Sequence, residues 1–138
     1  MIPYSHQAIG SDDIRAVARI LASDWLTQGP TIEHFERELA GKVGARYAVA
    51  FSSGTAALHG SYAAAGIGPM DEIITSPLTF AATANIALWQ GAIPIFADID
   101  EITGTLDPVE AEKKITKKTK AIVVVDYAGL PADLDALR

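Results

Sequence analysis

The sequence predicts an α/β fold, with a mostly parallel sheet and flanking helices. Short apolar runs that are typical of buried strands alternate along the chain with segments whose apolar residues recur at helical spacing. Polar turns follow the apolar runs, and glycines lie near the ends of the helical segments. Alternating strands and helices form right-handed βαβ units, so we expect the strands to be parallel in one sheet.

Two helices are expected before the first strand. Residues 11–21 begin with a serine and two aspartates, which suit a helix start, and their apolar side chains share one face. A loop at 25–30 follows. Thr31 is then expected to cap a second helix, and Gly44 lies just beyond its predicted end.

Four apolar runs are the predicted strands, at residues 47–51, 72–75, 93–97 and 121–125. The third run contains Pro94, which has no backbone N–H for a sheet ladder, so we expect this strand at an edge. The fourth run is the most continuously apolar and β-branched of the four. It is therefore expected to be the most buried strand.

Helices are also expected after the strands. A helix of small residues follows Ser53 and ends at Gly66, another covers residues 80–90, and a third has Pro108 at its first position. Residues 131–138 resemble the opening of one more helix. Because a domain seldom ends inside a helix, we expect the sequence to be truncated.

The composition limits the possible partners. The chain has 17 acidic and 11 basic side chains and a formal net charge of −6. This balance argues against nucleic acids and anionic membranes as main partners. A phosphorylated ligand stays compatible with it, because backbone amides at a helix start bind phosphate with few charged side chains.

Several classes of site are excluded by residue content. Cysteine is absent and the three histidines are scattered, so disulfides, thiolate zinc sites and cysteine nucleophiles are excluded and no metal is expected. The N-terminal sequence has no signal-like pattern, and the apolar runs are too short to span a bilayer. We therefore expect a cytoplasmic protein.

A possible phosphate site follows the first predicted strand, at the sheet edge where open parallel sheets bind ligands. Gly54 lets the backbone approach an anion, and the amides of the first helical turn, with the Thr55 hydroxyl, can donate to phosphate. The alternative is a plain turn from strand to helix with Thr55 or Ser53 as N-cap. The tetrapeptide at 53–56 alone favours the plain turn.

Phe80 follows the second predicted strand at the same edge. An aromatic side chain there is suited to stack on a flat ring. The alternative, which the residue alone favours, is a core aromatic that packs beneath its helix.

Carboxylates follow the third and fourth predicted strands, as Asp98, Asp100 and Asp126. They suit a metal or phospho-acceptor cluster, or else they cap helices and loop ends. Capping is favoured for Asp100, while both readings stay open for Asp98 and Asp126. An Asp98–Asp126 pair would make the chain a small α/β binding or signalling domain, which is the alternative function.

Five segments in order resemble the DegT/StrS-type sugar aminotransferases, a fold-type-I family that depends on pyridoxal phosphate. Across residues 1–138, they read W-L-T-Q-G-P, S-S-G-T-A-A-L, T-S-P-L-T-F-A-A-T-A-N, F-A-D-I-D and V-V-V-D-Y-A-G. The resemblance implies that the chain is the N-terminal, partial large domain that binds the cofactor. Within the family, it is most similar to members that aminate a 4-keto-6-deoxy UDP-sugar in pseudaminic acid biosynthesis, with glutamate as donor.

The resemblance also assigns roles to individual residues. It places the cofactor phosphate at Gly54, Thr55 and Ala56, although some relatives have serine in place of Ala56. It also implies that Phe80 stacks on the pyridine ring of the cofactor. It further implies a homodimer with shared active sites. The positions that it assigns to the sugar nucleotide are Tyr4, Leu26, Thr27, Gln28 and Gly29.

Two groups that the family needs for catalysis are expected outside the chain. The resemblance places the aspartate for the ring nitrogen, and the lysine that binds the cofactor covalently, after the last of the five segments. None of the six lysines here has the matching context. We therefore expect no catalytic residue in this chain and no activity from it alone. A relative that has lost catalysis is a further alternative.

Overall fold

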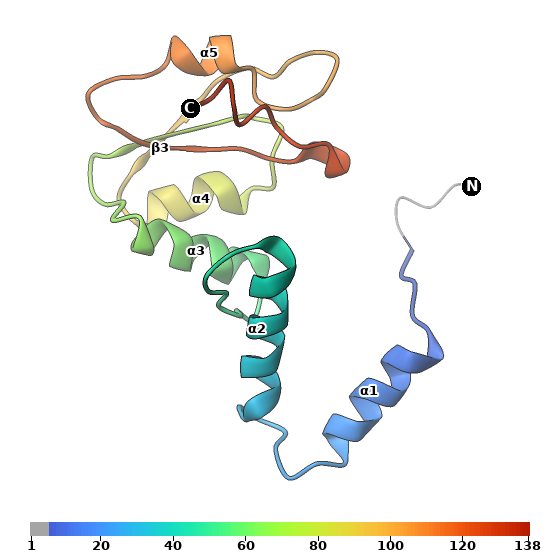
Figure 1. The fold of residues 1–138 in the computed structure, drawn as a ribbon. Helices are drawn as coiled ribbons and strands as arrows, with labels where there is room; N and C mark the ends of the chain where they lie inside the picture. The colour runs from blue at the N-terminus through green and yellow to red at the C-terminus, as the bar shows by residue number, and fades with distance from the viewer. Residues whose placement is uncertain (1–5) are drawn as a thin grey trace. The chain divides into compact units, whose positions relative to one another are not determined.

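The computed structural model describes residues 6–138, and Figure 1 draws its fold. The chain forms two compact units, Met1–Ala50 and Phe51–Arg138. The described part of the first unit is helical, and the second unit contains the sheet and the helices that pack on it, as the labels in Figure 1 show.

The first unit contains two helices, α1 (Ser11–Leu21) and α2 (Pro30–Val43). Gly10, rather than Ser11, precedes α1, and its N–H donates to the Asp13 carboxylate at 2.7 Å. The predicted cap of α2 at Thr31 is wrong, because Pro30 occupies the first helical position. Proline suits that position because its missing N–H would have no partner in the helix.

The predicted strand at residues 47–51 is not formed. Within residues 6–138 this segment pairs with no strand, and Tyr47 is 80% exposed. The N–H of Ala50 donates instead to the Glu36 carboxylate of α2, at 2.8 Å. A strand needs a neighbour to take its N–H and C=O groups, so an apolar run without one stays irregular.

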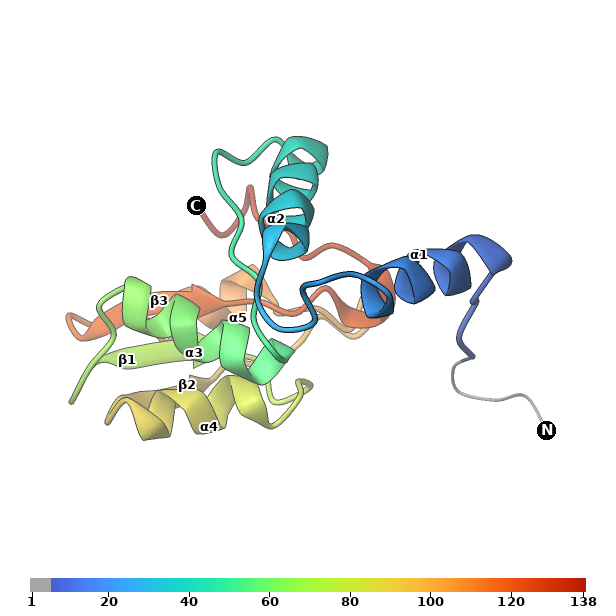
Figure 2. The ribbon, with the colours of Figure 1, turned by 90° about the horizontal axis from the view of Figure 1, so that it is seen from below.

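The second unit contains a parallel sheet of three strands among the described residues, where four were predicted. They are β1 (Glu72–Thr75), β2 (Ile93–Phe96) and β3 (Thr119–Val123). The order is β2-β1-β3, as the labels in Figure 2 show. The prediction of an edge position for the strand with Pro94 is confirmed.

The most buried strand is β1. The expectation that the fourth predicted run, which corresponds to β3, would be the most buried is wrong. Ile73 and Ile74 of β1 are fully buried, whereas the residues of β3 are partly exposed. The reason is position, because β1 has a neighbour on each side and β3 has one. Apolar content alone does not reveal the order of strands in a sheet.

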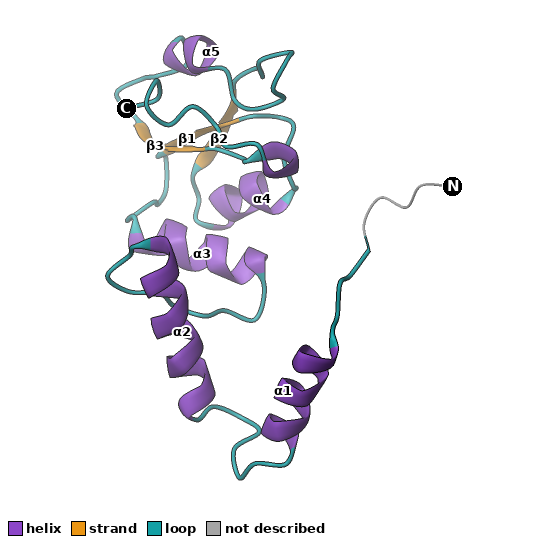
Figure 3. Ribbon diagram, turned by 45° about the vertical axis from the view of Figure 1, so that its right-hand side comes forward, coloured by secondary structure: helices purple, strands orange, loops and turns teal. Residues whose placement is uncertain are grey.

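Helices cover both faces of the sheet, as Figure 3 shows. On one face α3 (Gly54–Ala64) and α4 (Ala82–Trp89) pack on Ile73, and on the other α5 (Pro108–Glu112) packs near Ile74. Successive strand residues point to opposite faces, so these two isoleucines anchor two separate cores. The α/β architecture is thus confirmed.

The remaining boundaries differ in small ways from expectation. Helix α4 begins at Ala82, so Phe80 lies in the loop before it. A short 3₁₀ turn, Tyr127–Gly129, follows β3, and residues 131–138 form turns rather than the predicted helix opening. Within residues 6–138, every helix is too short or too polar to cross a membrane.

Thr75, at the carboxyl end of β1, offers a test of the core. Its side chain is fully buried, and its hydroxyl has no hydrogen-bond partner among residues 6–138. Valine has the same shape without the polar atom, so Thr75→Val is expected to stabilise the fold by about 1 kcal/mol in urea unfolding. Thr75→Ser, which keeps the hydroxyl and loses the methyl group, should destabilise it. A loss of stability in Thr75→Val would show that the hydroxyl has a buried partner.

Candidate functional site

The candidate site lies at the sheet edge where the three parallel strands end. Residues 76–81 follow β1, residues 97–100 follow β2 and residues 124–129 follow β3. Figures 1 and 2 show that α3 and α4 both begin on this side of the sheet. The predicted phosphate-binding segment and Phe80 therefore lie at one edge of the second unit.

The start of α3 is capped by a side chain. The hydroxyl of Ser53 accepts a hydrogen bond from the N–H of Ala56 at 3.1 Å, and the Ser53 carbonyl accepts one from Ala57 at 3.0 Å. The N-cap reading is thus correct for Ser53, and it uses the amide of Ala56. Among the described residues, the amides of Gly54 and Thr55 have no partner.

These free donors fit a phosphate group. A methyl group built on Gly54 would meet no atom within 4 Å beyond its chain neighbours and the backbone of its own helix, so a ligand can approach the backbone there. The half-buried Thr55 adds a hydroxyl beside the two amides. The positive end of the 11-residue helix favours negative charge at the same place.

Phe80 is exposed rather than packed in the core. Its side chain is 74% exposed, so the reading of Phe80 as a core aromatic is wrong. Its backbone is held in place, because its carbonyl accepts a hydrogen bond from Thr83 at 3.0 Å. The loop therefore presents a flat apolar ring to the solvent at the edge of the sheet.

The aspartates at this edge cap their own loops. Asp98 accepts a hydrogen bond from the N–H of the next residue at 2.8 Å, and Asp126 accepts one from Ala132 at 3.0 Å. Hydrogen bonds from Thr103 and Ile102 lower the pKa of Asp100, with the Thr103 backbone as the largest cause. Residues 6–138 contain no group of three acidic or histidine side chains that could hold a metal ion.

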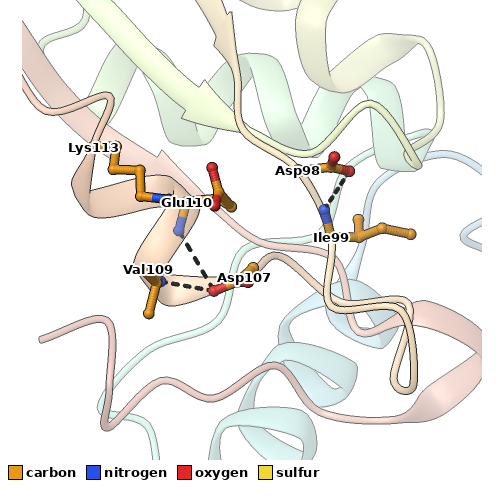
Figure 4. Close-up of polar contacts among 6 residues, drawn as sticks. All are labelled: Asp98, Ile99, Asp107, Val109, Glu110 and Lys113. Carbon is orange, nitrogen blue, oxygen red and sulfur yellow. Dashed lines mark hydrogen bonds and ion pairs between the residues drawn. The ribbon is translucent and has the colours of Figure 1, made fainter.

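Figure 4 shows how the acidic side chains near α5 are used. Asp107 caps the helix, because its carboxylate accepts hydrogen bonds from Val109 at 2.8 Å and Glu110 at 3.4 Å. The Glu110 carboxylate binds Lys113 at 2.6 Å, and this contact raises the pKa of the lysine. The Asp98 carboxylate accepts a hydrogen bond from the N–H of Ile99 in the same view. Asp107 and Glu110 therefore stabilise α5, and Asp98 stabilises the loop after β2.

The predicted sugar-nucleotide residues are in the first unit. The loop is tightly wound, because Gln28 and Gly29 both have positive φ, and a side chain on Gly29 would lie 2.8 Å from Trp25. Leu26 is exposed, as is Thr27. Tyr4 lies outside the described residues. The contacts of all five with a substrate stay a prediction.

Residues 7–138 match the DegT/DnrJ/EryC1/StrS aminotransferase family. The chain belongs to this family. The spore coat polysaccharide biosynthesis protein SpsC of Bacillus subtilis is 51% identical over 136 residues, which are 99% of this chain and 35% of that protein. The chain therefore spans about a third of the length of this relative. The family resemblance expected from the five segments is confirmed.

Solved structures agree with this assignment. Helicobacter pylori PseC, an aminotransferase of pseudaminic acid biosynthesis, is 38% identical with a TM-score of 0.90, over 98% of this chain and 37% of that one. Spr1654 of Streptococcus pneumoniae, which is described as a sugar aminotransferase, is 35% identical in its pyridoxal phosphate form. Its TM-score is 0.92, over 99% of this chain and 35% of that one. The expected fold-type-I architecture is confirmed, and pyridoxal phosphate is the cofactor that the family indicates.

Of two hydrogen bonds near the starts of α3 and α4, the Ser53 cap was predicted as one of two N-cap alternatives, and the other was not predicted. The Ser53 hydroxyl uses the Ala56 amide, and the hydroxyl of Tyr62 in α3 donates to the Thr83 carbonyl in α4 at 2.9 Å. The serine before a glycine and a threonine was a visible signal for the first. No local pattern indicates the second, because its partners are 21 residues apart.

Proposed function

We propose that the complete protein is a pyridoxal-phosphate-dependent transaminase that moves an amino group from glutamate to a 4-keto-6-deoxy UDP-sugar. In this proposal residues 1–138 are part of its large, cofactor-binding domain. Family membership supports the reaction class, and the likeness to PseC supports a sugar substrate of the kind made in pseudaminic acid biosynthesis. We further propose a homodimer with shared active sites, in the cytoplasm.

One observation carries the proposal most directly. The free amides of Gly54 and Thr55 are at the start of α3, and the exposed ring of Phe80 lies in the loop between β1 and α4. In the proposed complex, these amides and the Thr55 hydroxyl hold the phosphate group, and Phe80 covers one face of the pyridine ring. When bound, pyridoxal phosphate supplies an electron-accepting ring for amino-group transfer.

The sugar nucleotide is proposed to meet the first unit. Leu26 offers an exposed apolar side chain, and Thr27 and Gln28 offer polar groups in the same loop. Gly29 allows the turn that holds these residues together. Tyr4 completes the proposed set. We do not assign a catalytic role to any residue of this chain.

The reaction is tested with the complete protein, glutamate and a 4-keto-6-deoxy UDP-sugar. Amination of the sugar that depends on added pyridoxal phosphate supports the proposal, and its absence with correctly folded protein would contradict it. Residues 1–138 alone are expected to give no product, because the lysine and the ring-nitrogen aspartate are expected in later segments. Product from that chain alone would show that the assignment of these two groups is wrong.

Phe80→Ala is expected to weaken the binding of pyridoxamine 5′-phosphate by about five- to tenfold, because it removes the stacking surface. Binding of inorganic phosphate should stay unchanged, since the α3 amides are untouched. Both affinities are measured on the complete protein, with fluorescence of the pyridoxamine ring as the signal. The control Phe80→Tyr keeps a flat ring and should bind like the parent protein. Equal binding by the alanine variant would remove Phe80 from the site.

A further inference from the structure

Tyr62 connects the two helices that cover one face of the sheet. It lies in α3 and is 3% exposed, and its hydroxyl donates to the Thr83 carbonyl at the start of α4 at 2.9 Å. Water has little access to this pair, so the hydrogen bond is not readily exchanged for one to solvent. A tyrosine hydroxyl is protonated at neutral pH and can donate, and burial raises the pKa of Tyr62 further.

Thr83 holds the loop that carries Phe80. It is 5% exposed, and its N–H donates to the carbonyl of Phe80 at 3.0 Å. Its hydroxyl shares a hydrogen bond of 2.8 Å with the hydroxyl of Thr79, on the other side of Phe80 in the sequence. Backbone and side chain of Thr83 therefore both fix the loop, and Tyr62 fixes Thr83.

The same helix that carries Tyr62 begins with the phosphate donors. Gly54 and Thr55 form the first turn of α3, and Tyr62 lies about two turns further along it. A helix is a stiff element, so a hydrogen bond made by Tyr62 also restricts where Gly54 and Thr55 lie. The chain of contacts thus runs from the amides of α3 through Tyr62 and Thr83 to Phe80.

We propose that Tyr62 is a positioning residue that sets the spacing between the phosphate-binding amides of α3 and the ring of Phe80. The inference rests on the proposed function, because it assumes a ligand that joins a phosphate group to a flat ring. Such a ligand joins its ring and phosphate by a short linker, so a site that holds both groups works best when its two binding points keep their separation within about 0.5 Å. Loss of the Tyr62 hydroxyl leaves both points present and lets their separation vary.

A purely structural tyrosine makes a different prediction. If the hydroxyl only satisfies a buried carbonyl, its removal lowers the stability of the fold and leaves the affinity of the folded protein unchanged. If it sets the spacing, its removal weakens a ligand that uses both points and spares a ligand that uses one. Pyridoxamine 5′-phosphate uses both points without a covalent bond to the protein, and inorganic phosphate uses only the amides.

The test compares these two probes on the complete protein and its Tyr62→Phe variant. We expect pyridoxamine 5′-phosphate to bind about fivefold more weakly to the variant, the loss that corresponds to one neutral hydrogen bond. Inorganic phosphate, measured by competition, should bind equally well to both proteins. Tyr47→Phe is the matched control, since it removes the same atom from a side chain that is exposed. Thermal unfolding of the parent protein and of both variants identifies a temperature at which all three are folded, and the affinities are compared at that temperature.

Two results would overturn the inference. Equal weakening of both probes would mean that Tyr62 supports the phosphate site as a whole, and unchanged binding of both would mean that it supports only the core. If Tyr62→Phe does not fold, Thr79→Val tests the same chain of contacts at its other end, with Thr79→Ser as the variant that should restore binding. Failure of the parent protein to bind pyridoxamine 5′-phosphate would instead contradict the proposed function, and this inference with it.

Discussion

Replacement of Gly54 by proline is expected to weaken phosphate binding while helix α3 stays intact. Gly54 is the first residue of α3, where the N–H has no partner within the helix. Proline is favoured at this position and fixes φ at a helical value. The preceding residue must then be extended, and Ser53 already has φ of −161° and ψ of 162°. The substitution therefore removes one proposed donor without a cost to the fold.

The expected loss is large because the missing bond is made to a charged group. We expect Gly54→Pro to bind inorganic phosphate and pyridoxamine 5′-phosphate roughly 10- to 100-fold more weakly. Its unfolding midpoint should equal or exceed that of the parent protein. Gly54→Ala is the comparison variant: it keeps the amide and adds only a methyl group, so it separates the loss of the N–H from the filling of the space beside Gly54. Unchanged phosphate affinity in the proline variant would show that this amide does not hold the ligand.

Truncation of Ile73 is expected to have the largest effect on stability. Ile73 is fully buried on the central strand β1 and belongs to the core that includes Tyr62, Ile86 and Ala87. Ile73→Ala leaves a cavity between the sheet and two helices, so the free energy of unfolding should fall by about 3 kcal/mol. Urea unfolding measures this change.

The control for this substitution is Ile102→Ala, which removes the same atoms from a side chain that is 94% exposed. That variant should stay within about 0.5 kcal/mol of the parent protein. A small effect of Ile73→Ala would mean that β1 collapses onto the cavity. It would also weaken the view that this strand is the centre of the unit.

Local patterns were sufficient for much of the fold. Pro94 correctly indicated an edge strand, and Pro108 correctly indicated the first residue of α5. The segment at 47–51 misled because its composition suits a strand, yet a strand exists only beside another. The burial of β1 was missed for a related reason, since strand order depends on contacts between segments far apart in the sequence.

The candidate site was predictable to a similar degree. The edge position of Gly54 and Phe80 followed from the alternation of strands and helices. The exposure of Phe80 did not, because it depends on the point at which α4 begins. The hydrogen bond between Tyr62 and Thr83 was invisible to any local pattern, as it joins two helices across a buried contact.

The Ser53 cap has a consequence for how tightly a phosphate can be held. Its hydroxyl already occupies the Ala56 amide, at 3.1 Å. A phosphate oxygen that accepts a hydrogen bond from this third amide must first displace the hydroxyl. The Ser53 hydroxyl therefore competes with the ligand for the amide. Binding would then exchange one hydrogen bond for another, and only the difference between them would add to affinity. The cap therefore limits what the Ala56 amide adds to phosphate affinity and leaves the amides of Gly54 and Thr55 as the donors that bind without such an exchange.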